Sequence, residues 1–375
     1  MEYAIDTRCI HGEGHRHPDQ NCAISYPIYQ TASFSHLTPG HNPNGFDYSR
    51  ESNPTRAYLE ETVSSLENAY DTIAFASGMA AIATTFEYFR PGDRIILGED
   101  LYGGVARLIA RISEKNGYQT EYADTSDPAE LKERVCPGTK AVYLETPTNP
   151  MMRVTDIRAA SEIAHNAGAM LIVDNTFMTP YFQNPIAEGA DLVVHSGTKY
   201  LSGHNDTVCG FLCCAKPEHA EIFRLLSKTV GSTLGPFESW LCLRGIKTLA
   251  LRMERHKSNA EKVREWLLKN PKVDQVLYAG SGMISFTVES RELAEGILKH
   301  IRLITFAESL GGTESLLTFP TVQTHPDVPD ERKKKLGITD RLLRISVGIE
   351  NPDDITADLA RAFEEALQEN GRNGK

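Results

Sequence analysis

Short apolar runs alternate with amphipathic stretches of helical length between about residues 72 and 196, and this alternation limits the fold more than any other feature of the chain. Strands separated by helices of this length form βαβ units, in which the strands pair in parallel and helices cover both faces of the sheet. The pattern therefore predicts an α/β fold with a mostly parallel central sheet. The expected strands are 72–76, 94–98, 118–122, 140–145, 169–174 and 192–194, and the expected helices begin near Pro54 and Gly78 and continue at about 103–116, 128–135 and 156–167.

The pattern changes on either side of this region, which divides the chain into three parts. Residues 1–52 lack sustained periodicity and are expected to form an extended N-terminal arm that contributes to a neighbouring subunit. Residues 53–245 are expected to form the main domain, and residues 246–375 a smaller α+β C-terminal domain. Around the second boundary and beyond it we expect long helices over about 237–269, strands at 283–288, 303–307 and 342–347, a helix at 291–300 and a solvated helix at 331–335.

Composition and charge exclude several kinds of partner. Of the 375 residues, 41% are hydrophobic and 24% are charged, as in an ordinary globular protein. The net charge of -11 argues against nucleic acid, whose phosphates require clustered Lys and Arg. No apolar run approaches the roughly 20 residues that cross a bilayer. Because the first residues show no secretory signal either, we expect a cytoplasmic protein with no membrane partner.

The seven cysteines indicate neither a disulfide framework nor a metal site. Cys213 and Cys214 are adjacent within an apolar run, which favours buried, reduced thiols over disulfides. No Cys-x-x-Cys spacing is present, so we expect no bound metal.

Two apolar runs end in residues that suit one particular cofactor. The run 171–173 is followed by Asp174, and the run 192–194 leads to Ser196, Thr198 and Lys199. If both runs are parallel strands, the acid and the lysine lie at the same edge of the sheet. Pyridoxal phosphate needs a lysine amine to bind its aldehyde and a carboxylate to keep its pyridine nitrogen protonated. Small hydroxyl residues beside the lysine can donate to its phosphate.

These residues also allow other interpretations. A lone Ser-x-Thr-Lys is more often a surface lysine in a polar loop, so the motif needs its context. A dinucleotide oxidoreductase is disfavoured because no Gly-x-Gly-x-x-Gly follows a predicted strand. A protein that binds the cofactor without catalysing a reaction is disfavoured because every expected catalytic position is filled.

Six motifs, in order along nearly the whole chain, carry a family resemblance. They are Ser-Gly-Met (77–79), Leu-Tyr-Gly-Gly (101–104), Glu-Thr-Pro-Thr-Asn-Pro (145–150), Val-Asp-Asn-Thr-Phe (173–177), His-Ser-Gly-Thr-Lys-Tyr (195–200) and Glu-Ser-Leu-Gly-Gly (308–312). The chain resembles the pyridoxal-phosphate enzymes of cysteine and methionine metabolism. This resemblance implies the aspartate-aminotransferase-like fold, fold type I, with residues 53–245 as the cofactor-binding domain, and a homotetramer built as a dimer of dimers.

The resemblance also implies a set of cofactor-binding residues. Lys199 would bind the aldehyde and act as acid and base, Asp174 would pair with the pyridine nitrogen, and Tyr102 would stack on the ring and relay a proton. The implied phosphate contacts are Gly78, Met79, Ser196 and Thr198 of the same chain, with Tyr48 and Arg50 of the adjacent subunit. From local sequence alone, Tyr48 and Arg50 are ordinary loop residues.

A second implied set would bind small amino-acid substrates. Arg344, aided by Ser309 and Asn149, would bind the substrate α-carboxylate; taken in isolation, Arg344 could instead pair with Glu350. Arg107 would meet a distal carboxylate, with a solvated helix charge as the alternative. Glu308 would meet a distal ammonium. The family usually has a longer loop before the 283–288 strand, so substrate contacts from that loop are in doubt here.

Within the family, the residues favour cystathionine γ-synthase, which forms cystathionine from an O-acylhomoserine and cysteine, or the related O-acylhomoserine sulfhydrylase activity. Glu308, Arg107 and the Gly-Phe-Asp-Tyr run at 45–48 support this preference. A cystathionine γ- or β-lyase is the alternative. Methionine γ-lyases have a cysteine where this chain has Gly104, which disfavours that member.

Overall fold

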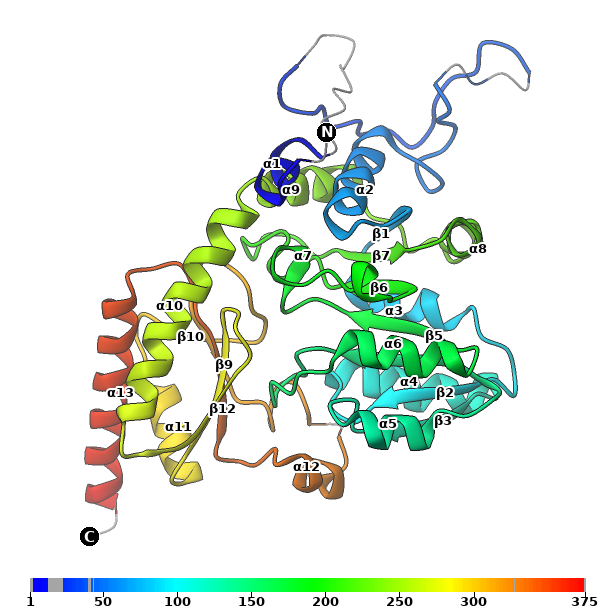
Figure 1. The fold of residues 1–375 in the computed structure, drawn as a ribbon. Helices are drawn as coiled ribbons and strands as arrows, with labels where there is room; N and C mark the ends of the chain where they lie inside the picture. Colours follow the sequence, from blue (N-terminus) through cyan, green and yellow to red (C-terminus); the bar gives the residue numbers. More distant parts are fainter. Residues whose placement is uncertain (1–2, 13–22, 40–41, 43, 327, 374–375) are drawn as a thin grey trace.

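The computed structural model of the protein describes residues 3–12, 23–39, 42, 44–326 and 328–373. Within these residues the chain builds a seven-stranded sheet and a separate five-stranded sheet, each with helices packed against it (Figure 1). Helix α10 (Leu249–Lys269) leads from the large sheet to the smaller one, and the described C-terminal residues lie beside the smaller sheet.

The large sheet confirms the predicted α/β fold. Its strand order is β1-β7-β6-β5-β4-β2-β3, and strands β2 to β6 pair in parallel. Only β7 runs antiparallel to its two neighbours. The strands are β1 (Asp71–Phe75), β2 (Arg94–Gly98), β3 (Gln119–Ala123), β4 (Thr139–Glu145), β5 (Met170–Asp174), β6 (Leu192–His195) and β7 (Gly210–Cys214).

Two of the helices around this sheet, α2 and α4, begin or end at signals seen in the sequence. Asn53 caps α2 by accepting a hydrogen bond from the Thr55 N–H, and Gly117 ends α4 with a φ of 73°, which glycine adopts without strain. The helices are α1 (Ile5–His11), α2 (Pro54–Glu67), α3 (Gly78–Phe86), α4 (Gly103–Asn116), α5 (Pro128–Arg134), α6 (Ile157–Asn166), α7 (Thr179–Phe182), the 3₁₀ turn η1 (Ile186–Glu188), α8 (Pro217–Val230) and α9 (Pro236–Ile246).

The prediction of an extended arm was wrong for its first residues, because Ile5–His11 form helix α1. Cys9 of this helix is buried in the main core, and Arg8 donates to Asn68 Oδ1 at the end of α2 over 2.7 Å. A helix of two turns is too short for its periodicity to be recognised in the sequence, and tertiary packing stabilises it here.

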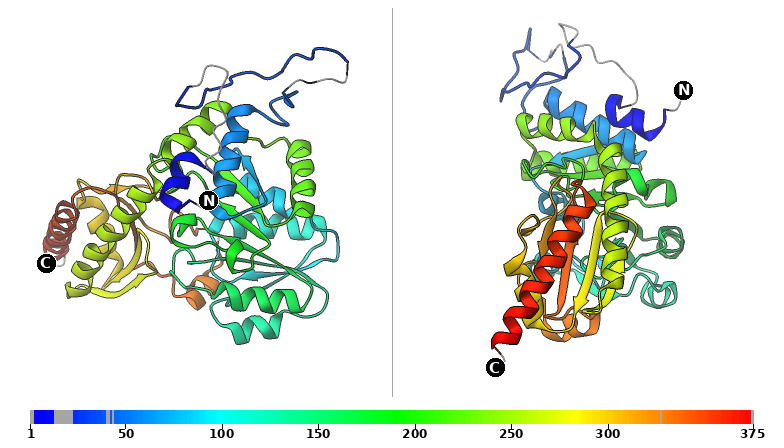
Figure 2. Two further views of the ribbon diagram at one scale, coloured as in Figure 1. Left: turned by 45° about the horizontal axis from the view of Figure 1, so that its top comes forward. Right: turned by 90° about the vertical axis from the view of Figure 1, so that its left-hand side faces the viewer.

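The smaller sheet has the order β10-β11-β12-β9-β8. Helices α10, α11 and α13 contribute apolar residues to one core with β9 and β12, and they lie together beside this sheet (Figures 1 and 2). Strands β8 and β11 were not predicted, and β10 is shorter than expected. The elements are β8 (Val273–Tyr278), β9 (Met283–Val288), α11 (Arg291–His300), β10 (Thr305–Phe306), β11 (Leu316–Thr318), α12 (Asp330–Leu336), β12 (Leu342–Ser346) and α13 (Pro352–Asn373).

The charge run at 331–335 is helical as predicted, in α12, and Glu331, Lys334 and Lys335 are exposed, but Arg332 is not a purely solvated charge. The Arg332 guanidinium lies 3.7 Å from the centroid of the Tyr122 ring and its Nε donates to the Glu99 carbonyl over 3.1 Å. Lys335 forms an ion pair with the Glu99 side chain. These contacts pack α12 against the large sheet. They involve charged side chains that the local sequence pattern predicts to be solvated.

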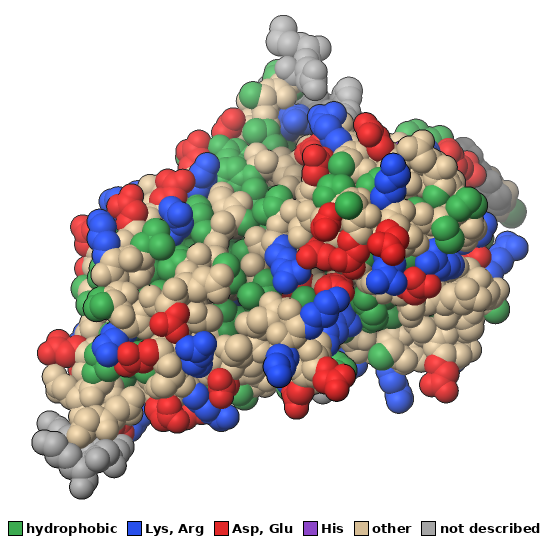
Figure 3. All heavy atoms as spheres, turned by 60° about the horizontal axis from the view of Figure 1, so that its bottom comes forward, with side chains coloured by type: hydrophobic (Ala, Val, Ile, Leu, Met, Phe, Trp, Pro, Cys, Tyr) green, Lys and Arg blue, Asp and Glu red, His purple; other side chains and the backbone are tan. Residues whose placement is uncertain are grey.

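Acidic and basic side chains are interspersed on the face shown in Figure 3. None of the helices in the described ranges has the combined length and apolarity needed to span a bilayer. In the same ranges no three His, Cys, Asp or Glu side chains are grouped so that they could hold a metal ion. The six cysteines that the structure describes are all free thiols, and five are buried.

Candidate functional site

Lys199 lies in the turn after β6, where its side chain faces the smaller sheet. Its Nζ donates a hydrogen bond to Ser309 Oγ over 3.0 Å. Burial, and then the positive charge of Arg344, lower the pKa of Lys199 to about 8. More of this amine is therefore neutral near pH 7 than for an ordinary lysine, as a nucleophile or a base requires.

Asp174 ends β5 at the same edge of the sheet, as predicted. Its Oδ1 accepts hydrogen bonds from the Thr176 N–H at 2.9 Å and from the Thr176 hydroxyl at 2.5 Å. Burial raises the pKa of Asp174, and the Thr176 bonds and the nearby His195 oppose that rise. A half-buried carboxylate at this place is stabilised by a cationic partner, and a protonated pyridine nitrogen would provide one.

The N-terminus of α3 and Ser196, just after β6, lie against each other and form one wall of the candidate site. Ser77 Oγ caps α3 by accepting from the Ala80 N–H over 3.0 Å. The N–H groups at the start of a helix have no intrahelical partner and favour an anion. A side chain on Gly78 would place its Cβ 2.9 Å from the Ser196 Cβ, so only glycine lets these two segments approach so closely.

Thr198 lies beside this wall with its hydroxyl already engaged. Its Oγ1 donates to the Cys209 carbonyl over 3.1 Å and accepts from the Cys209 N–H over 3.0 Å. To donate to a phosphate, this hydroxyl must release the Cys209 carbonyl, so in this structure it chiefly ties the lysine-bearing turn to β7.

Tyr102 is the N-cap residue of α4, and its own N–H donates to Glu145 Oε1 over 2.9 Å. Burial, and then Glu308, raise the pKa of the Tyr102 phenol, which favours its neutral form. The ring needs a residue without a side chain close by, because a Cβ on Gly104 would lie 2.5 Å from Tyr102 Cε1. Gly104, at the position where methionine γ-lyases have a cysteine, therefore leaves room for the Tyr102 ring.

Arg344 is buried in β12 and joins the two sheets. Its guanidinium donates to Asn149 Oδ1 at 2.7 Å, to the Ser309 carbonyl at 3.2 Å and to Thr318 Oγ1 at 3.3 Å. Its Nε has no hydrogen-bond partner among the described residues. The alternative pairing with Glu350 is not seen, since that carboxylate accepts from Ser315. A buried guanidinium with a spare donor suits a substrate carboxylate.

Ser309 connects the lysine to the arginine. Its hydroxyl accepts from Lys199 and its carbonyl from Arg344. Its φ of 106° lies in the left-handed region that non-glycine residues rarely adopt. Such a conformation persists only where surrounding contacts hold it, and it is commonest at functional sites.

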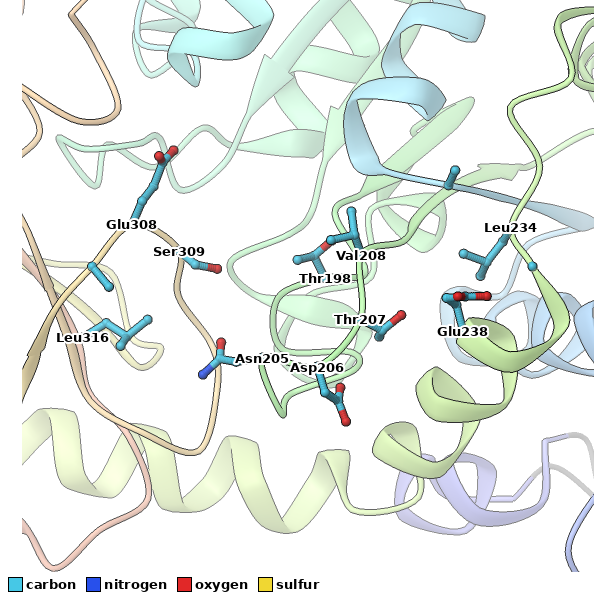
Figure 4. A pocket seen from close by; sticks show the side chains of 13 residues that line it. Thr198, Asn205, Asp206, Thr207, Val208, Leu234, Glu238, Glu308, Ser309 and Leu316 are labelled. Carbon is cyan, nitrogen blue, oxygen red and sulfur yellow. The ribbon is translucent and has the colours of Figure 1, made fainter.

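A cavity of about 880 Å³ opens beside these residues. Ser309 and Thr198 point toward each other across it, and Asp206, Glu238 and Glu308 also lie along its wall (Figure 4). None of the residues lining this cavity is cationic, although a phosphate bound near Thr198 would need positive charge.

Three predicted residues lie away from this cluster or at its edge. Arg107 is on the exposed side of α4, close enough to act electrostatically on Tyr102. Tyr48 and Arg50 lie in the arm, where the Arg50 guanidinium is 5.5 Å from the Tyr48 ring and donates to the Lys228 carbonyl over 2.5 Å. Within one chain they do not join the site.

Sequence reasoning missed several residues that support the cluster. His325 is buried, with its Nε2 3.0 Å from the Asn149 carbonyl and its Nδ1 2.7 Å from Thr324 Oγ1. Glu145 and Thr176 both lie within the motifs that carry the family resemblance, but no role was predicted for either. Their hydrogen-bond partners are distant in sequence or lie in the backbone, so no local sequence pattern predicts these contacts.

The amine, the half-buried acid, the anion-favouring wall and the guanidinium fit pyridoxal phosphate and an amino acid. Residues 6–364 match the family described as Cys/Met metabolism PLP-dependent enzyme. The chain belongs to this family. Its cofactor is accordingly pyridoxal 5'-phosphate, and the predicted family and fold are confirmed.

Relatives within the Cys/Met metabolism PLP-dependent enzymes include both synthases and lyases. Cystathionine gamma-synthase of Haemophilus influenzae is 44% identical over 97% of this chain and 98% of its own length. Cystathionine gamma-lyase of Bacillus subtilis is 43% identical over 96% of this chain and 98% of its own.

A solved structure supports the same conclusion. Cystathionine gamma synthase from Xanthomonas oryzae pv. oryzae, in complex with aminoacrylate and cysteine, superposes with a TM-score of 0.95 at 33% identity. It covers 98% of this chain and 100% of that one. The chain is thus an enzyme of sulfur amino-acid metabolism that acts by γ-replacement or elimination.

Proposed function

We propose that this enzyme catalyses γ-replacement, forming cystathionine from an O-acylhomoserine and cysteine. The supporting observation is a pair of opposite charges that both act on Tyr102: the Glu308 carboxylate, which lines the cavity, and the Arg107 guanidinium on α4. The carboxylate suits the ammonium of a second amino acid and the guanidinium suits a carboxylate, so together they favour a site that receives a second, zwitterionic substrate.

The residues of this chain have distinct roles in the proposal. Lys199 holds the cofactor and, when released, moves protons at Cα and Cβ of the substrate, for which its lowered pKa is apt. Asp174 keeps the pyridine nitrogen protonated, and Tyr102 stacks on the ring. When bound, pyridoxal phosphate supplies the electron sink that makes Cα and then Cβ acidic, so that the γ-substituent can leave.

The phosphate and the α-carboxylate are bound at opposite ends. Gly78, Met79, Ser196 and Thr198 cradle the phosphate, while Arg344, Asn149 and Ser309 orient the α-carboxylate. Tyr48 and Arg50 of a neighbouring subunit complete the phosphate site, which agrees with the absence of cations from the cavity lining. The enzyme is then at least a dimer, and we propose a homotetramer in the cytoplasm, with residues 1–52, 53–245 and 246–375 as arm and two domains.

A cystathionine lyase is the second candidate, because Glu308 would bind the distal ammonium of cystathionine equally well. The test gives the purified, cofactor-loaded enzyme cystathionine alone and, in parallel, O-acetyl- or O-succinylhomoserine with cysteine. Cystathionine formation faster than keto-acid release supports γ-replacement. Faster release of 2-oxobutyrate would identify a γ-lyase, and faster release of pyruvate a β-lyase.

A further inference from the structure

Glu145 links the two residues that are proposed to contact the cofactor ring. It ends β4 and is 6% exposed, and its Oε1 accepts the Tyr102 N–H over 2.9 Å. In the parallel ladder it is paired directly with Asp174 of β5. One side chain therefore fixes the start of α4, where Tyr102 lies, and neighbours the acid that faces the pyridine nitrogen.

The charge of this pair is constrained by its surroundings. Neighbouring strands lie about 4.8 Å apart, and paired residues of a parallel ladder face the same side of the sheet. Two carboxyls at that spacing, one buried and the other half-buried, cannot both ionise without a cost. The other titratable groups that act on Glu145 give it no positive charge, since they are Asp174 and Asp100, and Tyr143 lies on its own strand.

The hydrogen bonds indicate which carboxyl of the pair, Glu145 or Asp174, carries the proton. Asp174 accepts two bonds from Thr176 and is also favoured as an anion by His195. Glu145 accepts a single peptide N–H. Burial, and then the charge of Asp174, raise the pKa of Glu145 well above its usual range. Hydrogen-bond donors stabilise the charged form of a carboxyl. Asp174 accepts more hydrogen bonds than Glu145, so Asp174 keeps the negative charge.

We propose that Glu145 is a positioning residue that stays uncharged: it holds Tyr102 in place through the peptide N–H and leaves the negative charge of the pair on Asp174, which would face the pyridine nitrogen. This inference rests on the proposed roles of Tyr102 and Asp174. A second carboxylate here would compete with Asp174 for the pyridine proton, whereas a neutral acid supplies the hydrogen-bond acceptor without that competition.

The decisive variant is Glu145→Gln, which keeps the shape and the carbonyl acceptor but cannot ionise. Infrared difference spectra of the cofactor-loaded enzyme, wild type minus variant, near pH 7, report which form of Glu145 is lost. We expect loss of the C=O band of a protonated carboxyl. The control Glu121→Gln removes an exposed carboxylate that is paired with Arg94, and should remove carboxylate bands alone. Loss of carboxylate bands alone in Glu145→Gln would overturn the proposal.

Kinetics and the visible spectrum test the positioning role. Glu145→Gln should keep kcat and KM within about threefold of wild type and leave the pH dependence of the cofactor's visible band unchanged. Glu145→Met, which leaves the Tyr102 N–H unpaired, should lower kcat roughly ten- to a hundredfold while the cofactor stays bound. An equal loss in both variants, or a shifted spectral pH dependence in Glu145→Gln, would refute it. The infrared result does not depend on the reaction catalysed, so this inference and the proposed function fail separately.

Discussion

Acidification should destabilise this fold through His325, and the size of the effect follows from the environment of that side chain. His325 is 1% exposed and contacts Asn149 and Thr324. Burial, and then the charge of Arg344, lower its pKa from 6.5 to about 4. Between these values the unfolded chain binds a proton that the folded chain excludes, so stability is full above the unfolded pKa and falls as the pH falls toward about 4.

The loss of unfolding free energy on acidification follows from the pKa values of His325 in the unfolded and the folded chain. The full shift corresponds to about 3 kcal/mol of unfolding free energy, and about 2 kcal/mol of it is lost by pH 5. The variant His325→Gln keeps an amide donor for the Asn149 carbonyl but cannot titrate. Between pH 7.5 and pH 5 its unfolding free energy should therefore fall by about 2 kcal/mol less than that of wild type.

Urea unfolding of wild type, His325→Gln and the exposed-site control His11→Gln, at several pH values, measures this difference. The control should follow wild type, since His11 lies on the surface at the end of α1. Equal acid sensitivity in wild type and His325→Gln would refute the reasoning. A His325 ring signal that titrates above pH 6 in histidine-labelled protein would refute it as well.

Three further outcomes follow from the site. Lys199→Ala should abolish both the cofactor's visible absorption band and the physiological activity; a variant that keeps its activity would contradict the assigned role of the amine. Arg344→Leu should lower kcat/KM by roughly a hundredfold or more, mainly through KM, because the α-carboxylate loses its charged partner; initial-rate kinetics check this, and an unchanged KM would exclude Arg344 as the carboxylate site. Ser309→Gly should raise the unfolding free energy by about 1 kcal/mol relative to Ser309→Ala, because glycine adopts a φ of 106° without strain; equal urea midpoints would mean that Ser309 is not strained.

The sequence predicted the parts of the fold in which local pattern and tertiary role coincide. The strand from Met170 to Asp174 is an apolar run ended by an acid, and helix α4 ends at Gly117, as its pattern indicates. Strand β7 was missed, although its apolar run was noticed, because nothing local reveals that a strand inserts antiparallel between β6 and β1. Strand β11 has only three residues, which is too few for a period to be recognised.

The candidate site divides in the same way. Lys199, Asp174 and Arg344 were predictable because a charged residue that ends or interrupts an apolar run needs a special reason to be there. The contacts that hold them were not predictable, since they depend on backbone geometry and distant partners. The positive φ of Ser309 and the hydrogen bond from the Tyr102 N–H to Glu145 are examples, the latter joining residues 43 positions apart.

The same contacts show why the site requires both sheets at once. Arg344 and Ser309 come from the segments around the smaller sheet, and Lys199 and Asn149 from the large one, yet each pair is hydrogen-bonded across the boundary. The segment between Ser309 and Arg344 also carries His325 against Asn149, and Arg332 of α12 against Tyr122. Movement of the smaller sheet away from the large one would separate the amine from Ser309 and the guanidinium from Asn149 together. The contacts of α12 with the large sheet therefore help to hold Lys199, the proposed catalytic amine, and Arg344, the proposed carboxylate ligand, in place.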